Sequence, residues 1–203
     1  MPVYGVDQLK GLVTTRFGMA RRNQFMIKLP SIRGDTLSGE EKNLLCKSVS
    51  LPGVQNMTLE RLHGFYREKI PYAPAFPDVS MTFYVLNDYS IRKYFEEWRK
   101  LQWNYQSEAG YKNFFDGTIS IHQLKRPQVG VNFGFGDFSI VGAAGIDEKV
   151  YSVRLREAFP TSIGQIDLSN DQDGLVELTV NFSYTYWESY DAQDNLISGA
   201  FNF

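Results

Sequence analysis

A regular alternation of apolar and polar side chains near the C-terminal end constrains the fold more than any other feature. Between residues 176 and 186 every second residue is apolar, and the intervening residues are polar or charged. Because successive side chains of a β-strand point to opposite faces, this pattern predicts a long strand with one buried face. A shorter run at 165–168 precedes it, and turn-forming residues fill 169–174. We interpret the whole stretch as a β-hairpin.

Length and composition favour one globular domain. The chain has 203 residues, of which 43% are hydrophobic, so it contains enough apolar material to close a core. A single cysteine, Cys46, excludes an intramolecular disulfide, and His63 and His122 form no cluster with metal-ligand spacing. The start lacks the apolar core of a secretory signal, and no stretch approaches the ~20 apolar residues of a membrane-spanning helix. A reduced, cytosolic setting fits best.

Charge is distributed unevenly along the chain. Residues 1–156 carry all 21 Lys and Arg and 15 acidic residues, whereas 157–203 carry 8 acidic residues and no Lys or Arg. The net charge of −2 therefore combines +6 with −8. Three interpretations stay open: complementary surfaces between copies, a wall that repels polyanions, or a solvated hairpin with an acidic turn. A mildly acidic chain offers no basic groove for nucleic-acid phosphates.

Five further runs are predicted to form strands, and three of them, 23–29, 79–86 and 150–159, alternate clearly. The five are residues 23–29, 44–51, 79–86, 118–124 and 150–159. Pro30 ends the first because proline lacks a backbone donor, and the Pro52-Gly53 turn dipeptide ends the second. We expect residues 31–43 to form a loop, and residues 159–161 to turn the chain into the C-terminal hairpin. The protein is therefore expected to be mainly β.

One segment predicts an amphipathic helix. Residues 87–90 supply N-cap chemistry, and apolar residues then recur at spacings of three and four from Ile91 to about Trp103. Opposite charges four residues apart, such as Arg92 and Glu96, contribute about 0.2–0.5 kcal/mol per pair. The face expected to pack on the sheet consists of Ile91, Tyr94, Phe95, Trp98 and Leu101.

Residues 54–75 form an unusually long connection. Loops of this length are generally functional or bind a partner, and the large apolar side chains of this one would be poorly used in solvent. The alternative is a plain hairpin folded back onto the domain. The residues expected to contact a partner are Met57, Leu59, Leu62, Phe65, Tyr66, Arg67 and Tyr72.

Three other segments are expected to be appendages. The first twenty or so residues predict an arm with a short helix near 6–13. The glycine-rich residues 125–146 predict a flexible extension or irregular hairpin, and the polar tail after Glu188 predicts a second arm. Gly134 and Gly136 are followed by Ser139 where a dinucleotide-binding loop needs glycine, so that motif is excluded.

No recognisable catalytic pattern is present in the sequence. The nucleophile elbow, the Walker loop and the common zinc motifs are all missing. Cys46 lies in an apolar run and is expected to be a core residue, while neither His63 nor His122 has a nucleophile nearby in sequence. Asp171 and Asp173 lack the oxygen-ligand spacing of a calcium loop. We therefore expect no enzyme, no metal site and no cofactor.

Four blocks of sequence together resemble the tail tube protein of contractile-tailed bacteriophages, a family related in fold to the inner tube proteins of type VI secretion systems. The first two are MARRNQFMIKLP and LLCKSVSLPG. The more specific two are VSMTFYVLNDYSIRKYFEEWRKLQ and the closing FPTSIGQIDLS…LTVNFSYTYWE. The resemblance covers about residues 19–102 and 149–188, roughly three fifths of the chain.

The resemblance implies an antiparallel β-barrel or sandwich with one flanking amphipathic helix and extended loops and arms. It also implies hexameric rings stacked into a hollow tail tube, in which the loop 52–75 reaches the adjacent ring. The channel of such tubes is typically acidic, so that DNA slides through without sticking. The residues that could face it are Asp167, Glu177, Thr179, Asn181 and Ser183.

The implied partners are other copies of the chain, the tail sheath protein, the baseplate and tail terminator proteins, the tape measure protein and DNA in passage. The location is the virion tail, assembled in the host cytoplasm. We expect one tail-tube domain over residues 1–203, with an arm at 1–18, the stacking loop at 52–75, an insertion at 105–147 and an arm at 189–203.

Alternatives from the same and other classes stay open. The extra segments also fit a tube-initiating baseplate protein of the same fold, although the chain length favours the repeating subunit. A β-sandwich module could bind a ligand such as sugar through Tyr66 and Tyr72. An enzyme whose catalytic residues converge only in the fold would need His63 or His122 beside a carboxylate in a pocket.

Overall fold

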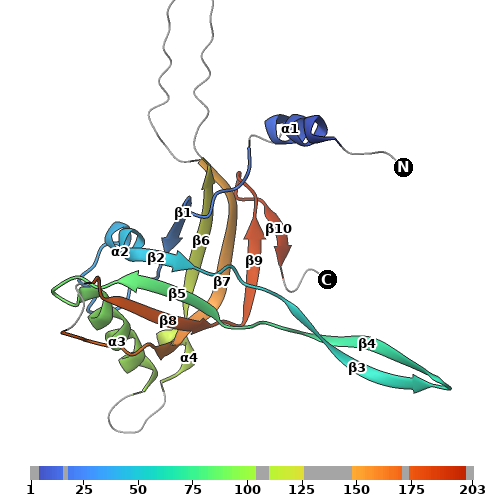
Figure 1. Cartoon of the computed structure of the whole chain (residues 1–203). Coiled ribbons are helices and arrows are strands. Elements are labelled where there is room, and N and C mark those ends of the chain that lie inside the picture. The colour runs from blue at the N-terminus through green and yellow to red at the C-terminus, as the bar shows by residue number, and fades with distance from the viewer. Residues whose placement is uncertain (1–4, 16–17, 104–109, 126–147, 171–173, 200–203) are drawn as a thin grey trace, which may run out of the picture.

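The computed structural model describes residues 5–15, 18–103, 110–125, 148–170 and 174–199. Most of the glycine-rich segment 125–146 and the turn residues Asp171 and Asp173 lie outside this part of the chain. Figure 1 shows two sets of strands that cross one another in a central body, with a hairpin and a helix projecting from it.

Ten strands and four helices make up the described part of the chain. The strands are β1 (Phe25–Lys28), β2 (Cys46–Val49), β3 (Gln55–His63), β4 (Tyr66–Ala75), β5 (Val79–Tyr84), β6 (Gly117–Lys125), β7 (Glu148–Ile163), β8 (Glu177–Ser183), β9 (Tyr186–Tyr190) and β10 (Leu196–Gly199). The helices are α1 (Val6–Thr15), α2 (Gly39–Leu45), α3 (Ser90–Gln102) and α4 (Lys112–Phe115). The predicted strands at 23–29, 79–86, 118–124 and 150–159 are confirmed as β1, β5, β6 and part of β7.

The strands form two antiparallel sheets that share one strand. Sheet A has the order β1-β6-β7-β9-β10, and sheet B has the order β2-β5-β8-β7. Strand β7 passes from sheet A to sheet B at Glu157, whose φ of 54° introduces a bend. The chain between β8 and β9 changes sheets beside it, where the Thr185 amide donates to the Arg156 carbonyl at 3.1 Å. The predicted sandwich is confirmed; the path of strands does not close into a barrel, because β1 and β2 are its two free ends.

The C-terminal hairpin differs from the prediction in its first strand. The partner of β8 is the end of β7, with Phe159 opposite Ser183 and Ile163 opposite Val180, whereas residues 165–168 are irregular. The predicted turn at residues 159–161 is therefore wrong. Pro160 stays in the strand because the ladder is irregular just after it, where a missing backbone donor costs little.

The predicted alternation is confirmed, but it spans two strands. Leu178, Val180 and Phe182 of β8 are fully buried, and the strand ends at Ser183 before β9 begins at Tyr186. At the start of this hairpin, the Gly164 amide donates to the Thr179 carbonyl oxygen at 2.7 Å. A Cβ on Gly164 would lie 2.7 Å from that same oxygen, so the close approach of the two backbones requires glycine.

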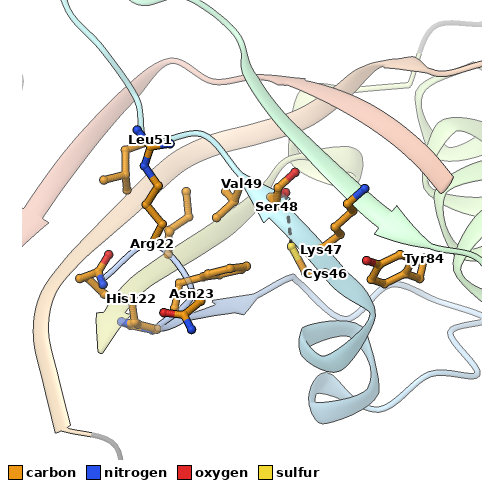
Figure 2. A pocket seen from close by; sticks show the side chains of 12 residues that line it. Arg22, Asn23, Cys46, Lys47, Ser48, Val49, Leu51, Tyr84 and His122 are labelled. Carbon is orange, nitrogen blue, oxygen red and sulfur yellow. Dashed lines mark hydrogen bonds between the residues drawn. The ribbon is translucent and has the colours of Figure 1, made fainter. Parts of the chain in front are cut away.

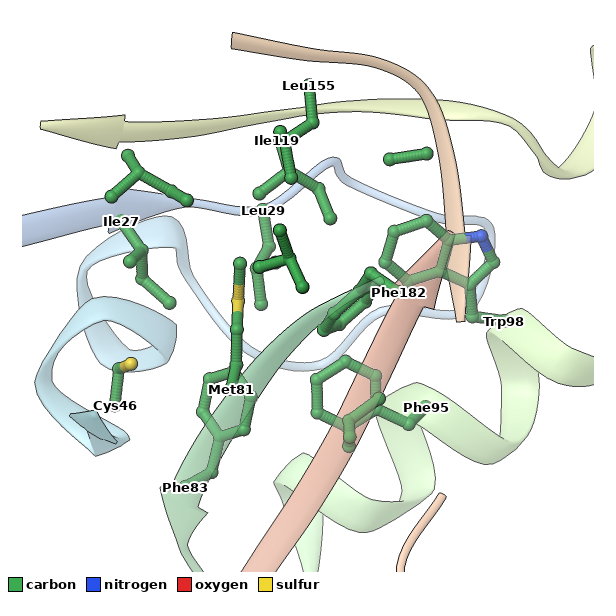
Figure 3. Packing of buried hydrophobic residues seen from close by; sticks show 14 of the residues in the cluster. Ile27, Leu29, Cys46, Met81, Phe83, Phe95, Trp98, Ile119, Leu155 and Phe182 are labelled. Atoms are coloured by element: carbon green, nitrogen blue, oxygen red, sulfur yellow. The ribbon is translucent and has the colours of Figure 1, made fainter. Parts of the chain in front are cut away.

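The core lies between the two sheets and against α3 (Figure 3). Sheet A contributes Ile27, Ile119 and Leu155, and sheet B contributes Met81 and Phe182, all within 2% of complete burial. Aromatic rings join the helix to sheet B, with ring centroids 5.2 Å apart for Phe83 and Phe95 and 5.9 Å apart for Trp98 and Phe182. Such pairs add about 0.5–1.5 kcal/mol beyond the burial of their area.

Helix α3 lies one residue earlier than the predicted boundaries. The N-cap residue Tyr89 makes no side-chain cap; instead, the Asp88 carboxylate just before it accepts from the Ser90 amide and hydroxyl at 3.1 and 2.9 Å. The Arg92 side chain donates to Glu96 at 2.8 Å, as the spacing predicts. The structure buries Ile91, Tyr94, Phe95 and Trp98 in the core and leaves Leu101 half-buried.

The segment before β2 is a helix rather than the expected loop. A reciprocal capping box starts α2: the Glu41 amide donates to the Ser38 hydroxyl, and the Ser38 amide donates to the Glu41 carboxylate. The buried Lys42 pairs with Asp35, and Asn43 accepts from the Ile27 amide at 2.8 Å. Helix α2 therefore covers part of the free edge of β1 and shortens the second predicted strand to β2.

The predicted C-terminal arm is, up to Gly199, part of the antiparallel strand pair β9–β10. Strands β9 and β10 pair around a turn in which the Asp191 carboxylate accepts from the Gln193 and Asn195 amides. Sequence reasoning expected one flanking helix and a short helix near 6–13 in the N-terminal arm, which is confirmed as α1. The described chain contains two further helices, α2 and α4, of which α4 has only four residues.

Candidate assembly surfaces

The segment expected to be a long loop is a regular β-hairpin. Strands β3 and β4 pair from Gln55 opposite Ala75 to His63 opposite Tyr66, with one irregularity after Met57. All nine residues of β3 are exposed. Figure 1 shows the hairpin extending away from the body, so the alternative of a hairpin folded back onto the domain is also wrong.

The two faces of this hairpin differ in character. Side-chain alternation and register place Met57, Leu59, Tyr66 and Ile70 on one face, and Arg61, His63 and Glu68 lie on the same side toward the tip. Tyr72 reaches the same face, since its hydroxyl lies 3.5 Å from the Met57 sulfur. We call this set, Met57, Leu59, Tyr66, Ile70 and Tyr72, the apolar face of the hairpin.

The opposite face of the hairpin is charged. Glu60 lies 3.6 Å from Arg67 and 3.9 Å from Lys69 there, and Leu62 is opposite Arg67. Phe65 occupies the tip and is fully exposed. The structure thus places four of the seven expected contact residues on the apolar face, two on the charged face and one at the tip. Because an isolated two-stranded hairpin is at best marginally stable in water, the uncovered apolar face indicates a partner.

A second surface is the outer face of sheet B, which is rich in hydroxyl and amide groups. The hydroxyls of Thr82 and Thr179 lie 3.3 Å apart, and Asn181 donates to Ser162 at 2.9 Å. The side chains of this face include Ser48, Ser80, Thr82, Ser162, Thr179, Asn181 and Ser183, together with Lys47, Tyr84 and Glu177. Many of these polar groups therefore already have partners within the face.

The expected channel residues are only partly brought together. Glu177, Thr179, Asn181 and Ser183 share this outer face of β8. Asp167 instead lies in the irregular segment after β7, exposed and accepting from Gln165 at 2.6 Å. The charge of Glu177 is compensated by the ammonium of Lys47.

A third feature is an open groove of about 800 Å³ between the free strands β1 and β2 (Figure 2). Phe25, Val49 and Ile121 give it apolar walls, and Arg22 and Lys47 give it positive charge. His122 lies on its wall, 3% exposed, with Nδ1 2.7 Å from the Ser152 hydroxyl. Burial, together with the charges of Lys149 and Lys28, lowers the His122 pKa to about 4, so the imidazole is neutral at neutral pH.

The family of the chain follows from its sequence profile. The profile described as "Phage tail tube protein" matches residues 18–190. The chain belongs to the phage tail tube protein family. No curated protein is significantly similar to it in sequence.

Solved structures share the fold of this tail tube protein at low sequence identity. The sheath-tube complex of an extracellular contractile injection system (PVC) contains a chain with TM-score 0.56 and 13% identity, covering 93% of this chain and 99% of that one. A chain of the anti-feeding prophage baseplate gives TM-score 0.55 and 11% identity, covering 86% and 97%. The tube-terminating cap of the same prophage gives 0.55 and 13%, covering 85% and 91%. At these identities the likeness shows the fold alone.

The uneven charge of the tail tube chain is largely neutralised within one molecule. Four of the six described acidic residues after residue 156 form ion pairs with basic residues from earlier in the chain. The pairs are Glu157 with Lys112, Glu177 with Lys47, Glu188 with Arg156 and Asp194 with Arg154. Hydrogen bonds from Lys112 and Thr185 hold the Glu157 pKa below its usual range. Sequence reasoning missed these pairs, because their partners lie far apart along the chain.

The groups considered for catalysis are placed apart. Cys46 is buried, which raises its thiol pKa to about 12. His63 is exposed near the hairpin tip, whereas His122 lies in the groove beside Ser152, which is completely buried. Among the described residues, no carboxylate hydrogen-bonds to either histidine, no three metal-ligating side chains gather, and no helix is long and apolar enough to cross a membrane. The exposed Tyr66 and Tyr72 lie on the projecting ribbon rather than in a pocket.

Proposed function

We propose that this tail tube protein is the repeating subunit of the inner tail tube, assembling into hexameric rings that stack through the β3–β4 hairpin. The observation that carries the proposal is the uncovered apolar face of that hairpin on a body whose own core is already filled. A monomer gains nothing from such a face, whereas an assembly buries it at about 25 cal/mol per Å² of apolar surface.

The outer face of sheet B is the proposed lining of the channel. Its hydroxyl and amide groups hydrogen-bond to one another, and Glu177 compensates Lys47, so the face offers no unpaired cation to phosphate groups. DNA would pass such a wall without being held. The tail sheath, baseplate, terminator and tape measure proteins are the proposed partners on the other surfaces, in a virion tail assembled in the host cytoplasm.

Shortening the hairpin tests the assembly. Met57 and Ala73 face one another in the ladder, so replacing residues 58–72 by Asn-Gly closes a tight two-residue turn between them. We expect the wild type to form rings and tubes in electron micrographs, and the shortened variant to remain a folded single copy. The substitution Glu60→Gln on the charged face is the matched control and should still assemble.

The outcomes of that experiment separate the possibilities. Long tubes of the wild type support the repeating subunit, whereas single rings that never extend support a tube-initiating baseplate protein of the same fold. Loss of folding in the shortened variant would show that the hairpin belongs to the core, and a strictly monomeric wild type at every concentration and salt condition would contradict the proposal.

Charge reversal tests the channel lining. Glu177→Lys breaks the pair with Lys47 and leaves two positive groups on the outer face of sheet B. We expect tubes of this variant to retain a short fluorescent DNA duplex at low salt and to release it as salt rises. Glu96→Lys, on the exposed side of α3, is the control. Equal retention by both variants would show that the outer face of sheet B lies elsewhere in the tube.

A further inference from the structure

Helix α1 is a second element without a partner. Its 10 residues carry Val6, Leu9 and Leu12 on one face, and these side chains are 69%, 54% and 60% exposed. None of the residues of α1 is buried. The family profile begins at residue 18, so α1 precedes the matched part of the chain.

Such a helix is too short to be stable by itself. Isolated helices of fewer than ~12–15 residues are marginal in water, and α1 contains Gly11 and ends in two threonines, which all favour other conformations. Its only described ion pair, Asp7 with Lys10, is highly exposed and therefore stabilises the helix little. The helix therefore requires a surface that covers Val6, Leu9 and Leu12.

The surfaces of the chain differ in what they can accept. The outer face of sheet B is polar, so it gives an apolar helix face nothing to bury against. The groove between β1 and β2 is bounded by free strand edges, whose unpaired backbone groups suit an extended segment better than a helix with internally bonded amides. The apolar face of the β3–β4 hairpin presents side chains above a paired ladder with one irregularity after Met57, so a helix can pack across it.

Size and charge also match between α1 and the hairpin. A helix of 10 residues is about 15 Å long, and the stretch of β3 from Met57 to Arg61 is about 14 Å long. Arg61 and Glu68 face one another across the hairpin on the side that carries the apolar face, and α1 carries one acid and one base, Asp7 and Lys10. The two elements have complementary charge patterns and project from separate places on the body (Figure 1).

We propose that α1 of one copy packs on the apolar face of the β3–β4 hairpin of a second copy, with Leu9 against Leu59 and Ile70. This inference rests on the proposed self-assembly and names the surface that covers the hairpin. Each copy then offers one helix and one hairpin face, so the contact is head-to-tail and can repeat from copy to copy.

Disulfide trapping between two singly substituted chains tests the contact. Leu9→Cys chains are mixed with Leu59→Cys chains of a different length and oxidised mildly, so that a covalent mixed dimer can form only between copies. We expect at least ten-fold more of it than in two control mixtures, Gln8→Cys with Leu59→Cys and Leu9→Cys with Thr58→Cys. In both controls one cysteine is on the wrong face. The buried Cys46 is common to all chains, and its raised pKa keeps it unreactive.

Removal of residues 5–15 provides an independent measurement. Because none of these residues is buried, the shortened chain should keep its melting temperature, while the concentration needed for assembly should rise at least ten-fold. Equal trapping in all mixtures, preferential trapping of Leu9→Cys by Val49→Cys in the groove, or unchanged assembly would each overturn this contact. If wild-type tubes form in those cases, the proposed function stands without it; if the wild type never assembles, the proposed function itself fails.

Discussion

The β3–β4 hairpin and the β7–β8 strand pair are built alike and used differently. Both are antiparallel pairs with apolar side chains on one face and polar ones on the other. In β8 the apolar side chains Leu178, Val180 and Phe182 are completely buried by the chain itself. In β3 the corresponding Leu59 is 62% exposed. The same pattern thus specifies a core where the chain supplies the second layer, and leaves an uncovered face where it does not.

The largest expected effect lies in the buried pair. Phe182→Ala removes a ring that contacts Phe95 and Trp98, and it leaves a cavity that the packed core cannot fill. We expect a loss of about 3–5 kcal/mol in the free energy of unfolding, measured by urea denaturation of the unassembled protein. A loss below about 1 kcal/mol would show that β8 is not part of the stabilising core.

A smaller loss is expected at the glycine where the two strands of the buried pair approach each other. The new methyl group of Gly164→Ala would lie 2.7 Å from the Thr179 carbonyl oxygen, so the backbone must move. We expect a cost of about 1–3 kcal/mol in the same urea measurement. Gly174→Ala is the matched control, because nothing lies within 4 Å of its added methyl group. Equal costs at both positions would contradict the close approach.

The Glu188–Arg156 ion pair, close to the point where β7 passes from sheet A to sheet B, predicts that stability depends on pH. Partial burial acts to raise the Glu188 pKa, but hydrogen bonds from Tyr190 and Arg156 outweigh it and hold the pKa below the usual 4.5. A carboxyl group with a lowered folded-state pKa stabilises the fold above its unfolded pKa, and this contribution is lost as the pH falls through the folded-state value. We expect Glu188→Gln to cost at most about 1 kcal/mol at neutral pH, since the pair is partly exposed.

The difference between Glu188→Gln and the wild type should therefore shrink between neutral pH and an acidic pH below the lowered Glu188 pKa, where the wild-type carboxyl is protonated and uncharged. Urea midpoints at the two pH values measure it. The protein with the shortened hairpin retains Glu188 and should show the wild-type pH response. A difference that stays constant with pH would mean that the variant acts through packing rather than through the charge.

The smallest effect on folding is expected in the hairpin. Leu59→Ser changes an exposed side chain, so the free energy of unfolding of the single copy should stay within about 0.5 kcal/mol of the wild type. Assembly should nevertheless fall, because the apolar face loses its central residue. Sedimentation and electron microscopy measure assembly, with Thr58→Ser on the charged face as control. If Leu59→Ser strongly reduced the free energy of unfolding but left assembly unchanged, Leu59 would belong to the folded core rather than to an assembly surface.

Much of the body was predictable, because its strands alternate and α3 has a clear periodicity. The wrong predictions of secondary structure lie in short segments whose residues are compatible with more than one type of secondary structure. Residues 165–168 have the composition of a strand. In the structure, however, β7 is long enough for residues 159–163 to pair with β8 in their place, and Gly164 permits the close approach of the two backbones. Helix α2 was missed although Ser38 and Glu41 stand at capping-box spacing, because the few apolar residues that follow them were assigned to the next strand.

The candidate surfaces were predictable in composition but not in arrangement. The apolar content of residues 54–75 indicated a partner-binding segment, whereas its register, and so the division into two faces, depends on an irregularity after Met57 that the sequence does not mark. Lys47 and Glu177 are 130 residues apart, and only the pairing of β2 and β8 with β5 brings them together. The sequence therefore showed the charges without showing their compensation.

The route by which the hairpin joins the body has a mechanical consequence. Residues 50–54 connect β2 to β3 and residues 76–78 connect β4 to β5, while β2 and β5 are themselves paired. The hairpin, a separate two-stranded sheet, is thus tethered through two short connections to the β2–β5 pair, and β5 in turn pairs with β8. The hydrogen bonds of these ladders lie perpendicular to the strands. A pull on the hairpin along its length draws β2 and β5 in the same direction, so it loads the rungs between β5 and β8 together in shear instead of opening them one by one. Tension between stacked subunits would accordingly be carried into the interior of sheet B and shared across it, giving the joint its stiffness along the strand direction.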